Sequence, residues 1–489
     1  MSPILILVPV FLPIAGGAAL LFLHLKSEKV RNLFSEGIAL STAIFVWVML
    51  LKGSRDPVSI YSFTGGFEIC FRIDGLSALF AGMVSVMWPV ILPYAFAYMK
   101  DAKRKNSFFA FYVMTYGITL GIAFAADLLT MYVFYEMLTL VTIPLVCHYQ
   151  DHAGMFAGRK YAAYVIGGAS LAFIAVVLVT LYGNGGMFSY GGTLSKVPDR
   201  KLMLLIYLFG FFGFGVKAAV FPLHGWLPDA SVAPTPVTAL LHAVAVVNSG
   251  VFAVARLTYY SFGAAYLYGT WAQEAALLAA EFTMVFGAAM ALKERHFKRR
   301  LAYSTVSNLS YMLFGIMLLT PDGFLGGMLH MFFHSIIKMS LFLCAGAFMY
   351  ATGNEYIYEI NGIGKHMPVT FGLYTLGALS LTGVPLFCGF VSKWKLFAAA
   401  AEENTPAAIM GIAALLIAAF FCAVYTLSVS VRAFFPAKGK DRYPAGTEIR
   451  ETDIRLLFPI GIFAVLNLFF GVYPAPVINF LNTVAQGLR

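Results

Sequence analysis

The chain has 489 residues, of which 60% are hydrophobic and 11% are charged, and its mean hydropathy is +0.81. Soluble domains carry about 25% charged residues, so this composition excludes an ordinary soluble enzyme. The formal net charge of +10 does not indicate nucleic-acid binding, because the basic residues stand in short clusters between apolar segments. We therefore predict an all-α polytopic membrane protein that forms one transmembrane domain over residues 1–489.

Apolar runs that are long enough to cross a membrane recur from one end of the chain to the other. A helix of ~20 residues crosses ~30 Å of hydrocarbon, and on this basis we predict about fourteen spans. Their predicted limits are 3–25, 33–52, 75–99, 107–125, 128–148, 161–183, 202–221, 237–260, 267–292, 301–320, 324–351, 369–397, 405–431 and 456–475.

The loop charges provide a test of this count. Of the 33 Lys and Arg residues, about 21 fall in loops after odd-numbered spans, and about seven fall on the opposite side. The clusters include "KDAKRK" and "KERHFKRR". Because cytoplasmic loops carry an excess of Lys and Arg, we predict that these clusters lie on the cytoplasmic side of the cell membrane and that both termini face outward.

Glu136 lies in the apolar segment "LLTMYVFYEMLTLVTIPLV", with no other charge between Asp127 and Asp151. A charged residue at membrane depth is costly and usually marks an ion pathway. The alternative is a polar contact between helices that serves packing alone. Either interpretation requires a partner, for which a buried lysine is suited.

Lys217 lies 16 residues after Lys201 and 12 residues before Asp229. These separations correspond to ~24 Å and ~18 Å along a helix, more than a lysine covers by extending its side chain to the interface. Pro222 lacks a backbone donor, which predicts a structural break in the helix near Lys217. Since broken helices at membrane depth line protein or polar cavities, we predict that Lys217 belongs to an ion pathway with Glu136 as its partner. A change in their separation would change the proton affinity of both groups.

Three titratable residues share one stripe of the segment "LHMFFHSIIKMSLFL": His330, His334 and Lys338 are spaced at i, i+4 and i+8. Two histidines four residues apart match the spacing of a metal site, but no HExxH glutamate and no third ligand accompany them. We therefore predict no metal and favour a proton relay; histidines bonded in the core are the alternative. His242, in "PTPVTALLHAVAVV", is a further candidate.

The segment "PLFCGFVSKWKLF" places Pro385 before Lys393, whereas Lys217 precedes its proline. Spans 4–8 and 9–13 form two blocks of five, and each block has a lysine and a proline in its fourth span. Because each block has an odd number of spans, the second block has the opposite orientation in the membrane. We therefore predict inverted repeats over 107–260 and 267–431, with Pro222 and Pro385 at structural breaks in spans 7 and 12.

Five segments resemble the antiporter-like proton-pumping subunits of respiratory complex I, of Mrp-type cation/proton antiporters and of membrane-bound hydrogenases. They are "YEMLTLVTIPL", "VKAAVFPLHGWLPDASVAPTPVTALLHA", "FKRRLAYSTVSNLSYM", "HMFFHSIIKMSLFL" and "GVPLFCGFVSKW". The resemblance implies a proton pathway of polar residues along the middle of the membrane. Its members here are Glu136, Lys217, His242, His330, His334, Lys338 and Lys393.

The chain departs from the family at several positions, one of which is Pro385–Leu386 in place of the usual double proline before span 12. Asn248 stands where several subunit types have a second lysine, and His296 stands where an acid often precedes the "KRRLAYS" segment. The parent complex, the subunit type and the choice between H⁺ and Na⁺ therefore stay open.

We expect the chain to pump protons as a non-redox subunit of a complex of the NADH:quinone oxidoreductase or membrane-bound hydrogenase type. The sequence has no Fe–S cysteine cluster, Rossmann fingerprint or P-loop, so no cofactor is expected in this chain. The expected partners are other membrane subunits, further antiporter-like subunits, peripheral redox subunits and lipid. The alternatives are a subunit of an Mrp-type Na⁺/H⁺ antiporter and a scaffold whose polar axis has lost its function.

Overall fold

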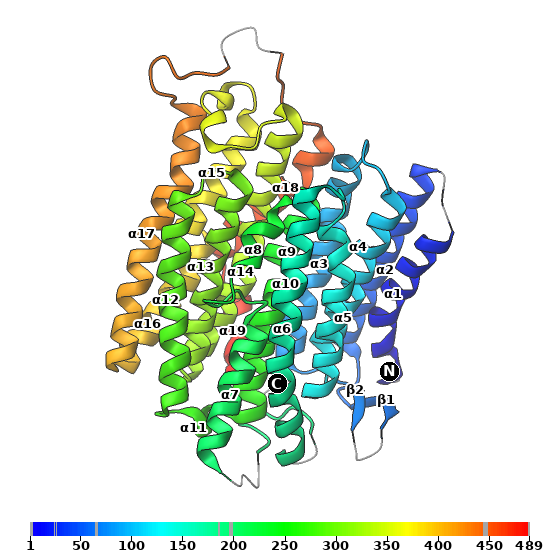
Figure 1. The fold of residues 1–489 in the computed structure, drawn as a ribbon, viewed down its shortest axis with the longest axis vertical. Coiled ribbons are helices and arrows are strands. Elements are labelled where there is room, and N and C mark those ends of the chain that lie inside the picture. The colour runs from blue at the N-terminus through cyan, green and yellow to red at the C-terminus, as the bar shows by residue number, and fades with distance from the viewer. Residues whose placement is uncertain are drawn as a thin grey trace.

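The computed structural model describes residues 3–23, 25, 27–63, 67–183, 186–194, 199–443 and 448–487, and it is mostly helical (Figure 1). The elements up to residue 267 are η1 (Pro3–Ile6), α1 (Leu7–Phe22), α2 (Glu28–Lys52), β1 (Val58–Ser62), β2 (Glu68–Phe71), α3 (Gly75–Tyr98), α4 (Lys105–Phe124), α5 (Leu128–Val146), α6 (His152–Tyr182), α7 (Arg200–Gly215), α8 (Trp226–Asp229), η2 (Ala230–Val232), α9 (Thr235–Ala243), α10 (Val246–Ala255), the π-helical η3 (Arg256–Phe262) and α11 (Ala264–Leu267). The remaining elements are α12 (Trp271–Lys293), α13 (Phe297–Met317), α14 (Pro321–Thr352), η4 (Ile357–Glu359), η5 (Ile363–Lys365), α15 (Pro368–Thr382), α16 (Cys388–Glu403), α17 (Pro406–Phe434), α18 (Ile454–Val472) and α19 (Ala475–Ala485).

Short polar side chains determine where several long helices begin. The residues before α5, α6, α12, α14 and α17 each accept a hydrogen bond from a backbone N–H in the first turn; they are Asp127, Asp151, Thr270, Thr320 and Thr405. Such a cap satisfies one of the free amides at a helix start. The apolar runs between these caps form the helices because the hydrocarbon core provides no partners for backbone groups.

The number of spanning helices differs from the prediction. Within the described residues, 11 helices are long and apolar enough to cross a membrane, so the predicted count of about fourteen is not confirmed. The three predicted spans without such a helix are 202–221, 301–320 and 369–397. In the structure they correspond to the short α7, to the more polar α13, and to the pair α15 and α16.

The most buried helices lie in the middle of the bundle, with α14 near the centre of Figure 1. In the most apolar stretch of residues 235–262, 100% of the residues are buried, and for α14 the share is 94%. For α1, α2, α17 and α18 the share is 33%, which places these four at the periphery. The elements that carry His242, His330, His334 and Lys338 are therefore surrounded by protein.

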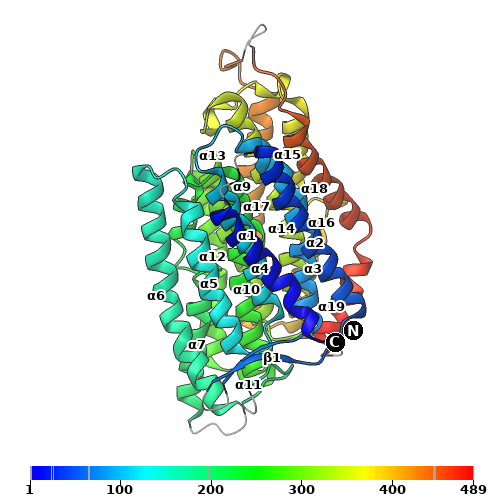
Figure 2. The same ribbon diagram turned by 90° about the vertical axis from the view of Figure 1, so that its right-hand side faces the viewer.

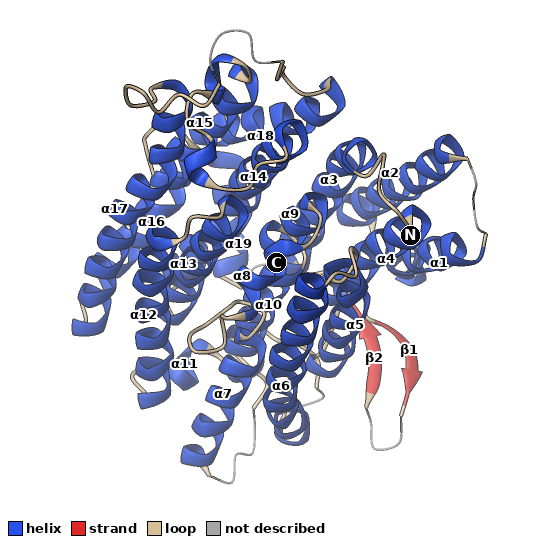
Figure 3. Ribbon diagram, turned by 45° about the horizontal axis from the view of Figure 1, so that its top comes forward, coloured by secondary structure: helices blue, strands red, loops and turns tan. Residues whose placement is uncertain are grey.

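The two ends of the bundle differ. Figures 1 and 2 show both termini at the end that carries the β1–β2 hairpin, whereas the loop between α17 and α18 lies at the opposite end. Figure 3 shows the two strands at one edge of an otherwise helical structure. The hairpin is antiparallel, and it is bonded to the α4–α5 loop because Ala126 N donates to Cys70 O (2.9 Å) and Arg72 N donates to Phe124 O (2.8 Å). It thus covers part of this end of the bundle.

Candidate functional site

Lys217 lies directly after a helix that stops inside the bundle. Helix α7 ends at Gly215, and residues 216–225 are turns before the short α8. The predicted structural break near Lys217, with Pro222 in the non-helical segment, is confirmed. Helix α10 packs closely against this turn: a Cβ on Gly250 would lie 2.4 Å from Ala218 N and 3.0 Å from Lys217 Cβ. Glycine at position 250 therefore lets α10 approach the backbone of the broken segment.

Side chains of three other elements satisfy the backbone groups that this break leaves free. The Tyr135 hydroxyl of α5 donates to Phe214 O (2.8 Å). The Trp226 indole of α8 donates to Val216 O (2.8 Å). Phe221 N donates to the Thr283 hydroxyl of α12 (3.1 Å). A buried backbone group without a partner is costly, so these bonds stabilise a non-helical segment at membrane depth.

The ammonium of Lys217 is bound by the residue that precedes Glu136. Lys217 is fully buried, and its Nζ donates to the backbone O of Tyr135 and lies 3.4 Å from the centroid of the Tyr135 ring. Glu136 is half-buried, and its Oε1 has no hydrogen-bond partner in the described part of the chain. Among the described residues no ion pair joins Glu136 to Lys217, although the two groups interact electrostatically. The structure therefore places them as neighbours without a salt bridge.

A further helix break, which the sequence did not predict, lies beside His242. The predicted span 237–260 is divided into α9 and α10, and the Asn248 amide donates both to Ala243 O (2.8 Å) at the break and to Ser335 Oγ of α14 (2.7 Å). His242 is fully buried, and both of its ring nitrogens lack a hydrogen-bond partner within the described residues. Its ring packs against Phe342 of α14, with centroids 5.0 Å apart.

The stripe of His330, His334 and Lys338 lies on α14 as predicted, and its members have different surroundings. His330 Nδ1 lies 2.9 Å from Ser392 Oγ, and the His330 and His334 ring centroids are 6.1 Å apart. Both ring nitrogens of His334 lack a partner among the described residues. Lys338 donates to Ser304 Oγ (2.7 Å) and to the backbone O of Leu301 (2.9 Å).

Lys393 lies after a second predicted break. Helix α15 ends at Thr382 and α16 begins at Cys388, so Pro385 lies in the gap, and the predicted break in span 12 is confirmed. The Lys393 Nζ donates to Leu381 O (2.6 Å) and Thr382 O (3.2 Å). Unlike Lys217, it is bonded to the carbonyl end of its own broken helix.

The predicted residues form two groups. His334 interacts electrostatically with Lys338, His330, His242 and Lys393. These residues, which run from position 242 to 393 in the sequence, therefore lie near one another in space. Lys217 and Glu136 form the other group. In the described residues no hydrogen bond links Lys217 to His242. Helix α10 contacts both groups of residues, because its Gly250 packs on Lys217 and its Asn248 bonds to α14.

The structure also buries charged residues that the sequence did not assign to the pathway. Lys298 was expected in the basic loop "KERHFKRR", but α13 begins at Phe297, and the buried Lys298 donates to Ala233 O (2.8 Å). Arg256 is fully buried beside Asp74, and Glu281 is buried in α12. Their burial depends on which face of the helix meets another helix, which a single sequence does not reveal.

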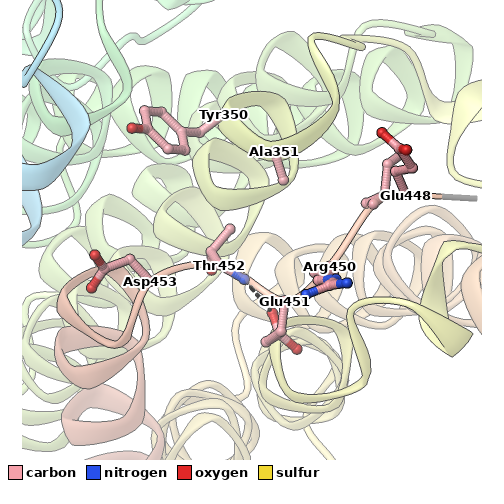
Figure 4. Close-up of a pocket in the computed structure, with 8 residues that line it drawn as sticks. Tyr350, Ala351, Glu448, Arg450, Glu451, Thr452 and Asp453 are labelled. Carbon is pink, nitrogen blue, oxygen red and sulfur yellow. Dashed lines mark hydrogen bonds between the residues drawn. The ribbon is translucent and has the colours of Figure 1, made fainter.

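A cavity of about 580 Å³ lies at the loop before α18, away from the residues described above (Figure 4). It is lined by Tyr350, Ala351 and residues 448–453, none of which is a predicted pathway residue. Glu451 of this loop accepts bonds from Val369 N (2.8 Å) and Thr370 Oγ1 (2.6 Å) and so caps α15. The loop thereby stabilises the start of the helix that ends beside Lys393.

Interrupted helices that hold buried lysines at membrane depth are typical of the class of ion-translocating membrane proteins. Within that class, residues 125–421 match the sequence model described as "NADH:quinone oxidoreductase/Mrp antiporter, TM", and residues 61–109 match "NADH-Ubiquinone oxidoreductase (complex I), chain 5 N-terminus". The chain therefore belongs to the NADH:quinone oxidoreductase/Mrp antiporter membrane-subunit family.

Related sequences come from both branches of this family. The chain is 31% identical to NADH-quinone oxidoreductase subunit L of Mycobacterium tuberculosis over 94% of its own length and 74% of the relative's length. It is 29% identical to NADH-quinone oxidoreductase subunit N of Desulforudis audaxviator, covering 98% and 97% of the two chains. It is also 29% identical to the A-type subunit of the Na⁺/H⁺ antiporter of Alkalihalophilus pseudofirmus, covering 84% and 53%.

Two solved structures share the fold. A chain of the Mrp complex from Dietzia sp. superimposes with a TM-score of 0.85 at 21% identity, covering 99% of this chain and 97% of that chain. A chain of the archaeal membrane-bound sulfane sulfur reductase superimposes with a TM-score of 0.83 at 24% identity, covering 98% and 97%. The protein is thus an antiporter-like membrane subunit of the kind found in multi-subunit membrane complexes.

Proposed function

We propose that this chain carries protons along Glu136, Lys217, His242, His330, His334, Lys338 and Lys393. The observation that carries the proposal is the environment of Lys217, Lys338 and Lys393. All three side chains are buried and bonded to backbone carbonyls or a hydroxyl, and among the described residues none has a carboxylate within 4.0 Å. An ammonium without an opposite charge releases its proton more readily than one in a salt bridge, so these groups are suited to gain and lose protons.

Protons fit this row of residues better than Na⁺. Lysine and histidine are positive when charged and therefore repel a metal cation, whereas they exchange protons directly. Sodium in proteins is held by oxygen atoms of carboxylates, carbonyls and hydroxyls, and the oxygens nearest Lys217, Lys338 and Lys393 already accept hydrogen bonds from the ammonium groups.

The energy for pumping comes, in this proposal, from redox subunits of a larger complex. Moving one charge against 100 mV costs ~2.3 kcal/mol, so transport against a gradient requires a driving reaction. The NADH-quinone oxidoreductase relatives, matched over 94% and 98% of this chain, support such a complex, with further membrane subunits and peripheral redox subunits as partners.

A Na⁺/H⁺ antiporter complex is the second candidate. It is favoured by the relative from the Alkalihalophilus antiporter, matched over 84% of this chain, and by the Mrp complex structure with a TM-score of 0.85. In such a complex the same lysines would carry the proton half of the exchange, and no redox subunit would be needed.

The proposal includes an orientation and an internal symmetry. The outward position of both termini is supported by the uneven distribution of Lys and Arg between the loops on the two sides. Inverted repeats over 107–260 and 267–431 are supported by a lysine-bearing break in each of them, at Lys217 and at Lys393.

The experiment purifies the complex that contains this chain, identifies its subunits and reconstitutes it in proteoliposomes. We expect Lys217→Ala and Glu136→Ala to abolish proton transport while the complex still assembles, and Lys438→Ala, at an exposed loop lysine, to leave transport unchanged. Normal transport by either pathway variant would reject the proton pathway, and normal transport by both would favour a scaffold. Flavin, Fe–S or nickel proteins in the complex support the redox pump, and a complex of small membrane subunits alone supports the antiporter.

A further inference from the structure

Glu281 is a buried carboxyl in the middle of a spanning helix, outside the pathway described above. It lies in α12 (Trp271–Lys293), seven residues after Glu274 and 12 residues before Lys293. These separations correspond to ~10 Å and ~18 Å along the helix. Only 4% of Glu281 is exposed, so the carboxyl is not at an interface with water.

The carboxyl of Glu281 is unpartnered. Neither Oε1 nor Oε2 has a hydrogen-bond partner in the described part of the chain, and no Lys, Arg or His among those residues lies within 4.0 Å as an ion-pair partner. An unpaired carboxylate in such a site is disfavoured, so the site favours the protonated form of Glu281. Packing alone would be better served by an apolar residue of similar size.

The surroundings of Glu281 leave room for its carboxyl. Its Oε1 points toward Gly411 of α17, where an added Cβ would lie 2.8 Å from this oxygen and 2.0 Å from a ring carbon of Phe314. A residue larger than glycine at position 411 would therefore displace the carboxyl or the ring. Glycine at this position keeps the three helices α12, α13 and α17 together around Glu281.

The end of the proton pathway lies one helical turn away. Tyr311 donates its hydroxyl to Leu415 O of α17 (2.9 Å), and Leu415 is four residues, or ~6 Å, along the helix from Gly411. The ring of Tyr311 lies 5.0 Å from Lys393 Nζ and stacks on His330 with centroids 5.3 Å apart. Tyr311 thus contacts the pathway residues His330 and Lys393 on one side and the helix that faces Glu281 on the other.

Glu281 lies on the outward side of Lys393 in the orientation proposed above. Helix α17 begins at Pro406, after an outward loop in that orientation, and runs inward through Gly411 and then Leu415. Helix α13 runs in the opposite direction, and its residue Phe314, which contacts the Gly411 level, follows Tyr311 toward the outward end. The level of Glu281 is therefore between Lys393 and the outward surface.

We propose that Glu281 is the proton-releasing carboxyl of this subunit, which receives protons from Lys393 by way of water molecules beside Tyr311. Glu281 first releases its proton outward and becomes a carboxylate. The Lys393 ammonium then gives up one proton and becomes a neutral amine, water molecules beside Tyr311 carry a proton onward, and Glu281 returns to the carboxylic acid. Water is needed because, among the described residues, no hydrogen bond joins the Tyr311 hydroxyl to Lys393 or to Glu281. The summed charge of Lys393 and Glu281 is zero before the transfer (ammonium and carboxylate) and zero after it (amine and carboxylic acid). This inference rests on the proposed proton transport.

The test uses the reconstituted complex with Glu281→Gln, and with Glu274→Gln as a matched control at an exposed position of the same helix. A positioned proton-transfer group contributes ~10²-fold or more to rate, so we expect Glu281→Gln to slow proton transport by roughly 10²-fold with assembly intact. Glu274→Gln is expected to transport at the wild-type rate. If Glu281→Gln fails to assemble, Glu281→Leu, which removes the unpaired polar group, takes its place.

A second readout follows the carboxyl itself. The infrared spectrum of wild type minus that of the Gln or Leu variant isolates the C=O stretching band of protonated Glu281, and we expect this band to shift in D₂O during turnover. Wild-type transport by the variant, or a band that does not exchange, would overturn the proposal. If Lys217→Ala and Lys393→Ala also transport normally, the proton pathway itself is wrong; if those two fail while Glu281→Gln transports, only the role of Glu281 is wrong.

Discussion

At the scale of single residues, the structure stabilises buried charges in two ways. Arg256 is fully buried and pairs through both of its terminal nitrogens with the two carboxylate oxygens of Asp74, at 2.6 and 2.8 Å. Its guanidinium also lies 4.5 Å from the centroid of the Tyr260 ring. Lys217, in contrast, donates to one backbone carbonyl and lies over the Tyr135 ring, with no carboxylate within 4.0 Å among the described residues. Two-point pairing fixes position, whereas a single bond to a carbonyl permits the ammonium to lose its proton.

We predict that Arg256→Ala destabilises the protein by roughly 1.5–3 kcal/mol, because the half-buried Asp74 carboxylate loses two charge-assisted hydrogen bonds and keeps the Ser77 N–H and the more distant Arg72. The measurement is the thermal unfolding midpoint of the purified protein in detergent. The double variant Arg256→Met with Asp74→Asn removes both charges and is expected to recover part of the loss. An Arg256→Ala protein that unfolds at the wild-type temperature would contradict this.

The same pair predicts a pH dependence. Burial raises the pKa of Asp74, but the charge and hydrogen bonds of Arg256 lower it, and the net shift is downward. A carboxyl with a depressed pKa in the folded state contributes stability above its ordinary pKa of about 3.9 and loses it as the pH falls below that value. The stability of Asp74→Asn should therefore depend less on pH than that of wild type in this acidic range.

At the scale of helices, the break after α7 depends on bonds from other elements. Thr283 of α12 accepts the hydrogen bond of Phe221 N (3.1 Å) and itself donates to Ala279 O (2.6 Å). This threonine connects a helix of the second predicted repeat to the break in the first. The broken segment is therefore held by tertiary contacts more than by its own sequence.

We predict that Thr283→Val destabilises the protein by about 1–3 kcal/mol, because Phe221 N is left without a partner. Thr119→Val is the matched control, since the buried Thr119 hydroxyl donates to Thr115 O of its own helix. Hydrogen exchange of the Phe221 amide is expected to accelerate in Thr283→Val and to stay unchanged in the control. Equal effects of the two substitutions would argue against a specific role for the Thr283 hydroxyl.

Sequence patterns predicted the breaks that contain a proline and missed the one that does not. Pro222 and Pro385 indicated the ends of α7 and α15, because proline has no backbone donor. The α9–α10 break has neither proline nor glycine at residues 243–245, and it depends on the Asn248 amide bond to Ala243 O. A side-chain bond of this kind forms only after α9, α10 and α14 pack together, so sequence alone does not reveal it.

Of two buried carboxyls, the sequence pointed to Glu136 and missed Glu281, again because helix packing is not visible in the sequence. Glu136 was singled out because a long uncharged segment surrounds it, whereas Glu281 lies closer to the charges that end its helix. A lone glutamate in an apolar helix has the same pattern whether it faces lipid, a partner or a neighbouring helix. Only the packing of α12 on α17 at Gly411 distinguishes these cases.

At the scale of the whole molecule, the two ends of the bundle carry different loops. The termini and the β hairpin lie at one end, and the loop between α17 and α18 lies at the other (Figures 1 and 2). If the basic loops are cytoplasmic, the hairpin end faces outward.

We predict that Lys440→Cys reacts with a membrane-impermeant maleimide only from the cytoplasmic side, and Arg55→Cys only from the outer side. Both positions are exposed. The native cysteines provide a low background, because Cys70, Cys344, Cys388 and Cys422 are buried and Cys147 is half-buried. Labelling in whole cells and in inverted vesicles distinguishes the sides, and the reverse pattern would invert the proposed orientation and with it the outward position of Glu281.

The bonds of Lys393 join its charge to the geometry of a helix end. Its ammonium binds the carbonyls of Leu381 and Thr382, which are the final groups of α15. When the lysine loses its proton it keeps fewer donors and binds these carbonyls less strongly, so the end of α15 is freer to move. If Lys393 ends a proton pathway, as proposed above, each change in its charge would also change how firmly the end of α15 is held in place.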